Sequence, residues 1–524
     1  MPANTNTISI ESFTQQKEVL DCLQQLEAKF GKNGERLVVS DVVDDDGHQY
    51  VNLVQKGGGV LGVALVGYTY ILEQMNIRFI RLAGTSAGAI NTALMTVIGA
   101  TPTPQGERKI TGNKKMAKSE GILKAICDLN FFSLVDGHPV ARFIIKNFIT
   151  NKDFTKQTTQ WLKRIIILLI LLPLLNFFCL GLQHKLLWVA YFTKAFFIIT
   201  AFYVMLLLVL AGYVAYLVNR LKDAGFGINP GDYFYTWIKN RMLENGIVTV
   251  SDLIDAAATP VPDLHLRNKP YEHPADLHGD VTFITSEIVS QNKIEFPKMW
   301  GLFRKNMNDL QPAGFVRASM SIPLFFESYF INDIPCTDPL IKANWLLLDE
   351  EDPPSTARFV DGGVLSNFPL NLFFNPNVAI PRLPSFGIDL DDQKEPDEVF
   401  GKATPESQKL DEDDSKKAAT WSFGDYLYRI FNTVRFYYDK DFLIKNAFFK
   451  QGIGVIPLKG YNWLNFFLTD AEKQRMFVLG AKAACKFLME DFSWESYKLG
   501  GTILRQNLES QSKKATTYDN GILQ

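Results

Sequence analysis

Two uncharged apolar segments in the middle of the chain constrain its fold more than any other feature. They are IIILLILLPLLNFFCLGL at 165–182 and AFFIITAFYVMLLLVLAGYVAYLV at 195–218. A helix that crosses a bilayer needs about 20 apolar residues, a length that the second segment exceeds and the first barely reaches. A pair of buried helices in a soluble core is the alternative, but helices that are apolar on every face are uncommon there. We therefore expect a helical hairpin in a membrane, and we favour two full spans over a re-entrant loop.

Basic residues beside the two segments indicate on which side of the membrane the rest of the chain lies. Those outside the hairpin are Lys156, Lys163, Arg164, Arg220 and Lys222, and those between its two segments are Lys185 and Lys194. Positively charged flanks stay on the cytoplasmic side. The sequence therefore predicts a membrane protein whose catalytic domain is cytoplasmic.

Charge and cysteine content exclude several other classes of protein. With 54 basic and 56 acidic residues, the formal net charge is −2, which provides no broad basic surface for a nucleic acid. The five cysteines are odd in number and scattered, without the paired spacing of a zinc site or a disulfide framework. We expect no nucleic-acid partner, and a reducing compartment.

Two glycine-rich turns follow two predicted strands in the first part of the chain. The run YVNLVQK at 50–56 leads into GGGVLG at 57–62 and a helix-like stretch over 60–75. A second run, IRFIRLA at 77–83, leads into GTSAG at 84–88 and another apolar helix. Strands that alternate with helices of this length predict an α/β fold with a parallel sheet.

The GTSAG turn has the pattern of a nucleophile elbow. A G-x-S-x-G turn presents a serine between a strand and a helix, where side chains at the glycine positions would clash. Ser86 is the predicted nucleophile, flanked by the elbow glycines Gly84 and Gly88. The backbone amides of Ala87 and of the run Gly57, Gly58 and Gly59 are the predicted oxyanion hole. A phosphate-binding loop is the alternative for the glycine run, but the run has no Gly-Lys-Ser/Thr ending, and no clear ribose-binding acid follows it as in a Rossmann G-x-G-x-x-G motif.

A serine hydroxyl needs a neighbouring base to take its proton. None of the six histidines, which are His48, His138, His184, His265, His273 and His278, lies in a context that marks it as that base. Asp361 directly follows a predicted strand at 357–360 and precedes Gly362 and Gly363. Asp-Gly is also a common turn pair, so only the elbow and the glycine run make Asp361 the preferred base.

Together, these motifs resemble those of the patatin-like phospholipase family. The glycine run at 57–62, the elbow at 84–88 and DGG at 361–363 occur in that order, with RASMSIPLFFE at 317–327 and SNFP at 366–369 around the last. The resemblance implies a Ser86–Asp361 dyad on a three-layer α/β/α fold, modified from the α/β-hydrolase type. It implies hydrolysis of acyl esters of phospholipids or lysophospholipids, with no metal and no cofactor. Leu61 stands where many family members carry Arg or Lys, which puts electrostatic help from that side chain in doubt.

The resemblance divides the chain into a catalytic domain with an insertion. We expect a helical extension at 1–45, the two halves of the patatin-like domain at 46–154 and 225–390, the hairpin at 155–224, an acidic linker at 391–420, a helical part at 421–510 and a tail at 511–524. Within the extension, Ser12 is a predicted helix cap and Gly31 a stop, and near the other end Thr469 and Glu472 have capping-box spacing. Residues Ile322 to Phe326 are either an acyl channel or plain core.

Two other functions stay open at this stage. A lipid acyltransferase would use the same nucleophile and replace water by an alcohol, and a membrane-anchored binding protein on the same fold would do no chemistry. The expected partners are the bilayer and its lipids, and a homo-oligomer also stays open.

Overall fold

The computed structural model describes most of the chain. The described residues are 8–103, 109–139, 142, 154–182, 187–223, 225–269, 277–375, 382–396, 400, 423–503 and 506. His184, Lys185, His273, the tail at 511–524 and most of the predicted linker at 391–420 lie outside them. The chain forms two compact units. We call Met1–Val135, Gly231–Pro323 and Ser328–Gln524 the body, and Asp136–Pro230 with Leu324–Glu327 the hairpin unit.

A mixed sheet forms the centre of the body. Five parallel strands run in the order β14 (Ile453–Pro457), β13 (Ser385–Asp391), β2 (Gln49–Gln55), β3 (Ile77–Thr85) and β8 (Asp280–Glu287). Antiparallel strands complete the sheet on both sides. Strands β12 (Ala357–Asp361) and β9 (Asn292–Phe296) pair with β8, and β11 (Tyr329–Ile331) pairs with β12. Strand β1 (Val42–Val43) pairs with β2, and β7 (His265–Leu266) pairs with β1. The predicted strands at 50–56, 77–83 and 357–360 are confirmed. The predicted parallel sheet is confirmed for the five central strands, and the antiparallel pairs that flank them make the whole sheet a mixed one.

Helices cover both faces of this sheet, so the predicted α/β/α architecture is confirmed. Side chains alternate between the faces of a strand, and in β2 the neighbours Val54 and Gln55 point to opposite faces. Gln55 donates to Thr92 on α4 (Ala87–Val97). Val54 packs in a cluster with η7 (Leu370–Phe373) and with Phe442 of α15 (Phe423–Lys445). Every residue of β2 is buried, which explains why the strand has no polar face.

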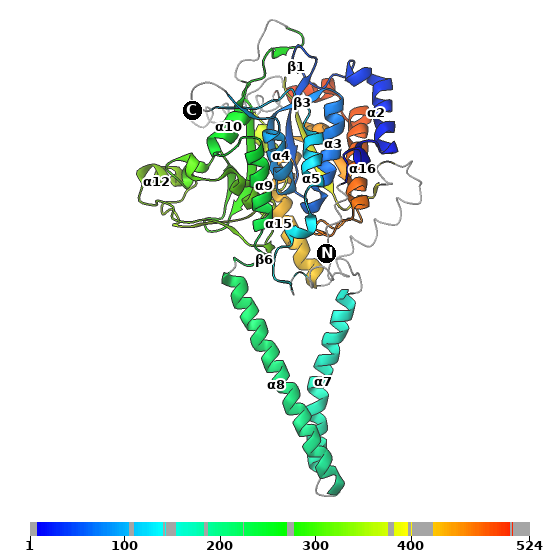
Figure 1. The fold of residues 1–524 in the computed structure, drawn as a ribbon, viewed down its shortest axis with the longest axis vertical. Coiled ribbons are helices and arrows are strands. Elements are labelled where there is room, and N and C mark those ends of the chain that lie inside the picture. Colours follow the sequence, from blue (N-terminus) through cyan, green and yellow to red (C-terminus); the bar gives the residue numbers. More distant parts are fainter. Residues whose placement is uncertain are drawn as a thin grey trace, which may run out of the picture. The chain divides into compact units, whose positions relative to one another are not determined.

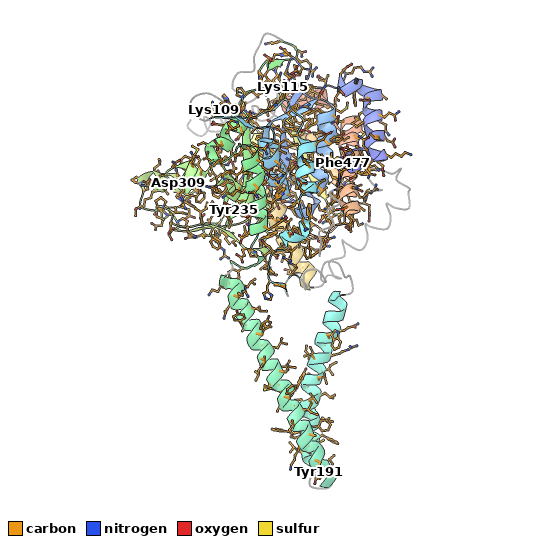
Figure 2. The ribbon with its side chains drawn as sticks, in the orientation of Figure 1. Lys109, Lys115, Tyr191, Tyr235, Asp309 and Phe477 are labelled. Carbon is orange, nitrogen blue, oxygen red and sulfur yellow. The ribbon has the colours of Figure 1, made fainter. Side chains whose placement is uncertain are left out.

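The last long helix of the body packs beside the first ones. In Figure 1, α16 (Asp470–Lys486) lies with α3 (Val63–Gln74) and α2 (Lys17–Phe30), and its contacts with both bear this out. Phe477 of α16, labelled in Figure 2, contacts Phe13 and Tyr70, each with ring centroids 5.7 Å apart.

The helix caps of the body test three sequence predictions. The capping box of Thr469 and Glu472 at the start of α16 is confirmed, and so is the end of α2 at Gly31. The prediction of Ser12 as the cap is wrong, because Ser12 lies in a separate short helix, α1 (Glu11–Thr14), and α2 begins after Gln16.

Helix α5 (Ser119–Cys127) packs on α3 and α4. The other helices of the body are α9 (Asp232–Glu244), α10 (Val250–Ala258), α11 (Pro312–Ser319) and α12 (Pro339–Leu346). Helix α11 packs on α9, β8 and β12, and α10 packs on α4 and β8.

The hairpin unit contains two long apolar helices, α7 (Phe154–Leu182) and α8 (Leu187–Asp223). Their stretches Lys163–Leu182 and Thr193–Lys222 are long and apolar enough to cross a membrane. The two helices run against each other over part of their length (Figure 1). Between them, the Asn176 side chain donates to the Thr200 hydroxyl at 2.9 Å, and the Tyr203 hydroxyl donates to the Ile165 carbonyl at 2.9 Å. Most of their apolar side chains are exposed, among them Phe177 at 78% and Leu208 at 68%. Length, composition and exposure are the features that favour membrane association.

Candidate active site

Ser86 lies at a strained turn between β3 and α4. Its backbone has φ 54° and ψ −120°, a region that a residue with a side chain adopts at a cost of about 1–3 kcal/mol. A Cβ atom on Gly84 would overlap the Gly88 carbonyl, and one on Gly88 would overlap the Gln55 carbonyl. The G-x-S-x-G pattern therefore follows from close packing of strand, turn and helix.

A second serine, which sequence reasoning missed, fixes this turn. Ser319, the last residue of α11, accepts a hydrogen bond from the Ser86 amide at 3.0 Å and donates to the Ile284 carbonyl of β8 at 2.6 Å. Its side chain is fully buried. Ser319 lies in the segment 317–327 that carries part of the family resemblance, and that was the only signal for it in the sequence.

Asp361 comes close to Ser86 across strand β8. In the sheet, Thr85 is level with Ile284 and Asp361 with Thr285, so β3 and β12 end on opposite sides of the same part of β8. Two strand spacings separate the two backbones by about 10 Å, and the Ser86 side chain lies close enough to Asp361 to lower the pKa of its carboxyl group. The Gly363 amide donates to Asp361 Oδ1 at 2.7 Å. The structure thus brings the predicted nucleophile and the predicted base together.

Burial sets the protonation behaviour of Asp361. The residue is 5% exposed, and burial raises the pKa of its carboxyl above the ordinary value, because a charge loses hydration in a protein interior. The nearby Ser86 hydroxyl, the positive charge of Arg435 and the Gly363 amide each lower this pKa and so oppose the effect of burial. The carboxyl group therefore has the raised pKa and the position of a proton acceptor for Ser86.

The backbone amides predicted to bind the oxyanion differ in whether they already donate to a backbone carbonyl. The Gly57 amide donates to the Asn367 carbonyl at 3.1 Å, and this bond removes Gly57 from the predicted set. Within the described part of the chain, the amides of Gly58, Gly59 and Ala87 donate to no backbone carbonyl. Ala87 begins helix α4, and the first amides of a helix have no partner within it and favour negative charge.

An apolar cavity of about 60 Å³ opens beside Ser86. Its lining is mostly aliphatic and aromatic, and includes Val63, Ile90, Leu94, Ile122, Ile126, Leu129, Phe131, Leu134, Phe234, Trp237, Met320, Ile322 and Phe466. Because a water molecule occupies about 30 Å³ of liquid, a long acyl chain would have to displace these side chains. Of the predicted acyl-channel residues, Ile322 lines the cavity, whereas Leu324, Phe325 and Phe326 form β10 (Leu324–Phe326) in the hairpin unit, where it pairs with β6 (Gly227–Asn229).

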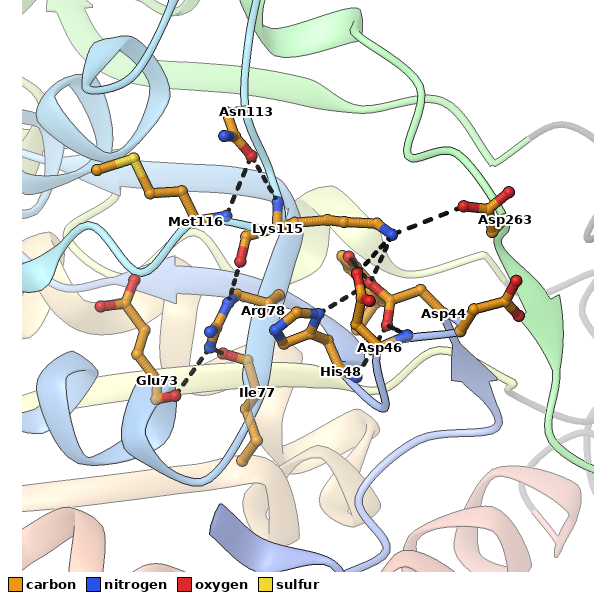
Figure 3. Close-up of polar contacts among 12 residues, drawn as sticks. Asp44, Asp46, His48, Glu73, Ile77, Arg78, Asn113, Lys115, Met116 and Asp263 are labelled. Carbon is orange, nitrogen blue, oxygen red and sulfur yellow. Dashed lines mark hydrogen bonds and ion pairs between the residues drawn. The ribbon is translucent and has the colours of Figure 1, made fainter.

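A cluster of acidic side chains elsewhere in the body has the kinds of ligand atoms that a metal ion could bind. Figure 3 shows Asp44, Asp46 and His48 with Lys115 among them, and ligand atoms of the first three lie within 4.8 Å of one another. The Lys115 ammonium is 2.8 Å from Asp46 and 3.8 Å from Asp44, and His48 Nδ1 is 2.9 Å from Asp44. Lys115 therefore supplies the positive charge that this cluster needs, and the cluster provides no argument for a metal ion.

Comparison with known proteins identifies the family to which this fold belongs. The family model described as patatin-like phospholipase matches residues 53–374, which is more than half of the 524 residues. An uncharacterized protein of Bacillus subtilis (strain 168), YqhO, is 52% identical over 46 residues, which cover 9% of this chain and 16% of that protein. The crystal structure of VipD from Legionella pneumophila aligns with 87% of this chain and 71% of that one, at a TM-score of 0.33 and 12% identity. At that TM-score, the likeness to VipD carries no argument.

Proposed function

This chain belongs to the patatin-like phospholipase family of lipid acyl hydrolases, and we propose that it cleaves carboxylic esters of membrane phospholipids or lysophospholipids with a Ser86–Asp361 dyad. The observation that carries the proposal is the placement of Ser86, at the end of β3, beside Asp361, a buried carboxyl group with a raised pKa. Ser86 also lines an apolar cavity, whose side chains suit an acyl chain in chemistry and would have to move to admit a long one.

In the proposed reaction, Asp361 accepts the proton of the Ser86 hydroxyl while Oγ attacks the ester carbonyl. The amides of Gly58, Gly59 and Ala87 hold the negative oxygen of the tetrahedral intermediate, and each such donor is worth about 3 kcal/mol of transition-state stabilisation. The proton passes from Asp361 to the leaving alcohol as the C–O bond breaks. A water molecule then gives its proton to Asp361, attacks the acyl-enzyme and releases the fatty acid, and Ser86 recovers the proton.

Two substitutions in the purified protein test this mechanism. We expect Ser86→Ala and Asp361→Asn each to abolish hydrolysis across a panel of lipid esters while the thermal unfolding temperature stays near that of the wild type. A fluorophosphonate should label the wild type and not Ser86→Ala, which distinguishes an enzyme from a binding protein on the same fold. Product analysis with an alcohol acceptor separates a hydrolase from an acyltransferase. Turnover that persists in Ser86→Ala protein would refute the dyad.

The two apolar helices support a second part of the proposal, which is that they hold the body at a bilayer with the body on the cytoplasmic side. Tethering raises the effective concentration of membrane lipids at the site without adding contacts. Deleting 165–218 should spare hydrolysis of a soluble short-chain ester and reduce hydrolysis of phospholipid vesicles. Equal vesicle activity after the deletion would contradict the tethering role, and protease accessibility of the body in sealed vesicles would test its side.

A further inference from the structure

Helix α15 lies outside the family match at 53–374, yet two of its side chains contact the loops that carry the proposed catalytic groups. The first is Arg435, whose Nε donates to the Gly363 carbonyl at 2.6 Å. The amide of the same Gly363 donates to Asp361 Oδ1 at 2.7 Å. Gly363 therefore connects the guanidinium of Arg435 to the carboxylate of Asp361.

The second side chain is Asp439, which is 8% exposed. Its carboxylate accepts three hydrogen bonds from one loop: the Ser366 hydroxyl at 2.8 Å, the Asn367 amide at 2.9 Å and the Phe368 amide at 2.8 Å. A carboxylate in this position satisfies three buried donors with one side chain.

The loop that Asp439 holds is bonded in turn to the predicted oxyanion loop and to the elbow. Asn367 exchanges two hydrogen bonds with Gly57, since the Gly57 amide donates to the Asn367 carbonyl at 3.1 Å and Asn367 Nδ2 donates to the Gly57 carbonyl at 3.2 Å. Thr85, beside the nucleophile, donates to the Ser366 carbonyl at 3.1 Å. A continuous set of hydrogen bonds therefore runs from Asp439 to the residues on either side of the site.

We propose that Arg435 and Asp439 are positioning residues of the Ser86–Asp361 site, so that α15 aligns both the general base and the oxyanion loop. The inference rests on the proposed function. It assigns the two side chains different tasks: Arg435 keeps Asp361 oriented and ionised through its charge and its bond to Gly363, and Asp439 holds Gly57, and with it Gly58 and Gly59, in place.

The two roles can be tested separately, because Arg435 changes the pKa of Asp361 and Asp439 is not among the groups that do. Charged side chains on the elements around Asp361 include Arg358 on its own strand, Asp280 and Glu287 on β8, Arg317 on α11, and Arg435, Asp439, Lys440 and Asp441 on α15. Of these, Arg435 is the one whose charge lowers the pKa of Asp361. Removal of its charge raises that pKa further, so the base loses its charge at a higher pH as the solution is acidified.

The pH profile of ester hydrolysis tests the role of Arg435. We expect Arg435→Gln, which retains a hydrogen-bond donor without the charge, to shift the acid limb of kcat/KM upward by about one pH unit, with partial recovery of the rate at high pH. Arg435→Lys should keep the acid limb near that of the wild type, and Arg429→Gln, the same substitution at an exposed position of α15, should leave the acid limb in place. An acid limb that stays in place in Arg435→Gln, or a rate that falls equally at every pH, would overturn this role.

A matched pair of substitutions tests Asp439. Asp439→Asn should lower kcat about tenfold without moving the acid limb, which is less than the loss of about 100-fold or more for a removed oxyanion donor, because the donors are displaced and not lost. Asp441→Asn, which breaks only the exposed pair with Lys445, should leave kcat unchanged. If Asp439→Asn fails to fold, Ser366→Ala removes one of the three hydrogen bonds and should lower kcat less. Wild-type kcat in a folded Asp439→Asn or Ser366→Ala variant would overturn the role of Asp439. Retained hydrolysis in Ser86→Ala would instead overturn the dyad, and this inference with it.

Discussion

Ser319→Ala offers a sharp test of how the strained turn at Ser86 is maintained. The substitution removes a hydroxyl that accepts from the Ser86 amide at 3.0 Å and donates to the Ile284 carbonyl at 2.6 Å. Both partners stay buried, and an unsatisfied buried amide costs about 1–3 kcal/mol. The turn already carries strain of about 1–3 kcal/mol from the positive φ of Ser86, so relaxation of Ser86 away from its productive conformation becomes easier.

If about 2 kcal/mol of this loss appears in the activation free energy, kcat for a soluble ester falls about 30-fold, with KM nearly unchanged. The matched control is Ser40→Ala, because Ser40 is also fully buried, accepts from the Val42 amide at 3.1 Å and donates to the Arg382 carbonyl at 3.4 Å. Thermal unfolding should show a loss of a few degrees in both variants, whereas only Ser319→Ala should lose activity. Equal stability losses with kcat within twofold of wild type in both would refute the positioning role of Ser319.

Three further predictions concern the site and its surroundings. Because burial raises the pKa of Asp361 from 3.8 and the base acts only when ionised, hydrolysis should fall as the pH drops through that raised pKa; an acid limb at or below the ordinary value would contradict this. Gly88→Ala places a methyl group against the Gln55 carbonyl and should lower both the unfolding temperature and kcat, unlike Gly121→Ala, whose Cβ meets only the side chain of Ile98. Chelation by EDTA should leave esterase activity unchanged, because Lys115 already pairs with the acidic cluster around Asp44; a loss reversed by added metal would show that reasoning to be wrong.

Features that depend on local sequence were predictable in this chain. The strands around 50–56 and 77–83, the capping box at Thr469 and the end of α2 at Gly31 all follow from neighbouring residues. The elbow glycines are equally local, since Gly84 must accommodate the carbonyl of Gly88 only four positions later.

The direction of β12 was not predictable from its residues. A strand followed by Asp-Gly-Gly looks the same in a parallel and in an antiparallel pairing. Its antiparallel pairing with β8 nevertheless decides that Asp361 meets the end of β3 across a single strand. The pKa of the Asp361 carboxyl group depends on how far the whole fold buries it, and the residues around Asp361 in the sequence do not show this burial.

By itself, the sequence determined the two apolar helices, the glycine pattern of the turns and the identity of Ser86 as the residue at the elbow, because composition and backbone sterics act over a few residues. Only the tertiary structure decided that Gly57 donates to Asn367 and that Ser319, Arg435 and Asp439 surround the site. Those contacts join residues far apart in the chain, and a hydrogen bond between them depends on how the sheet and helices pack and leaves no local pattern in the sequence.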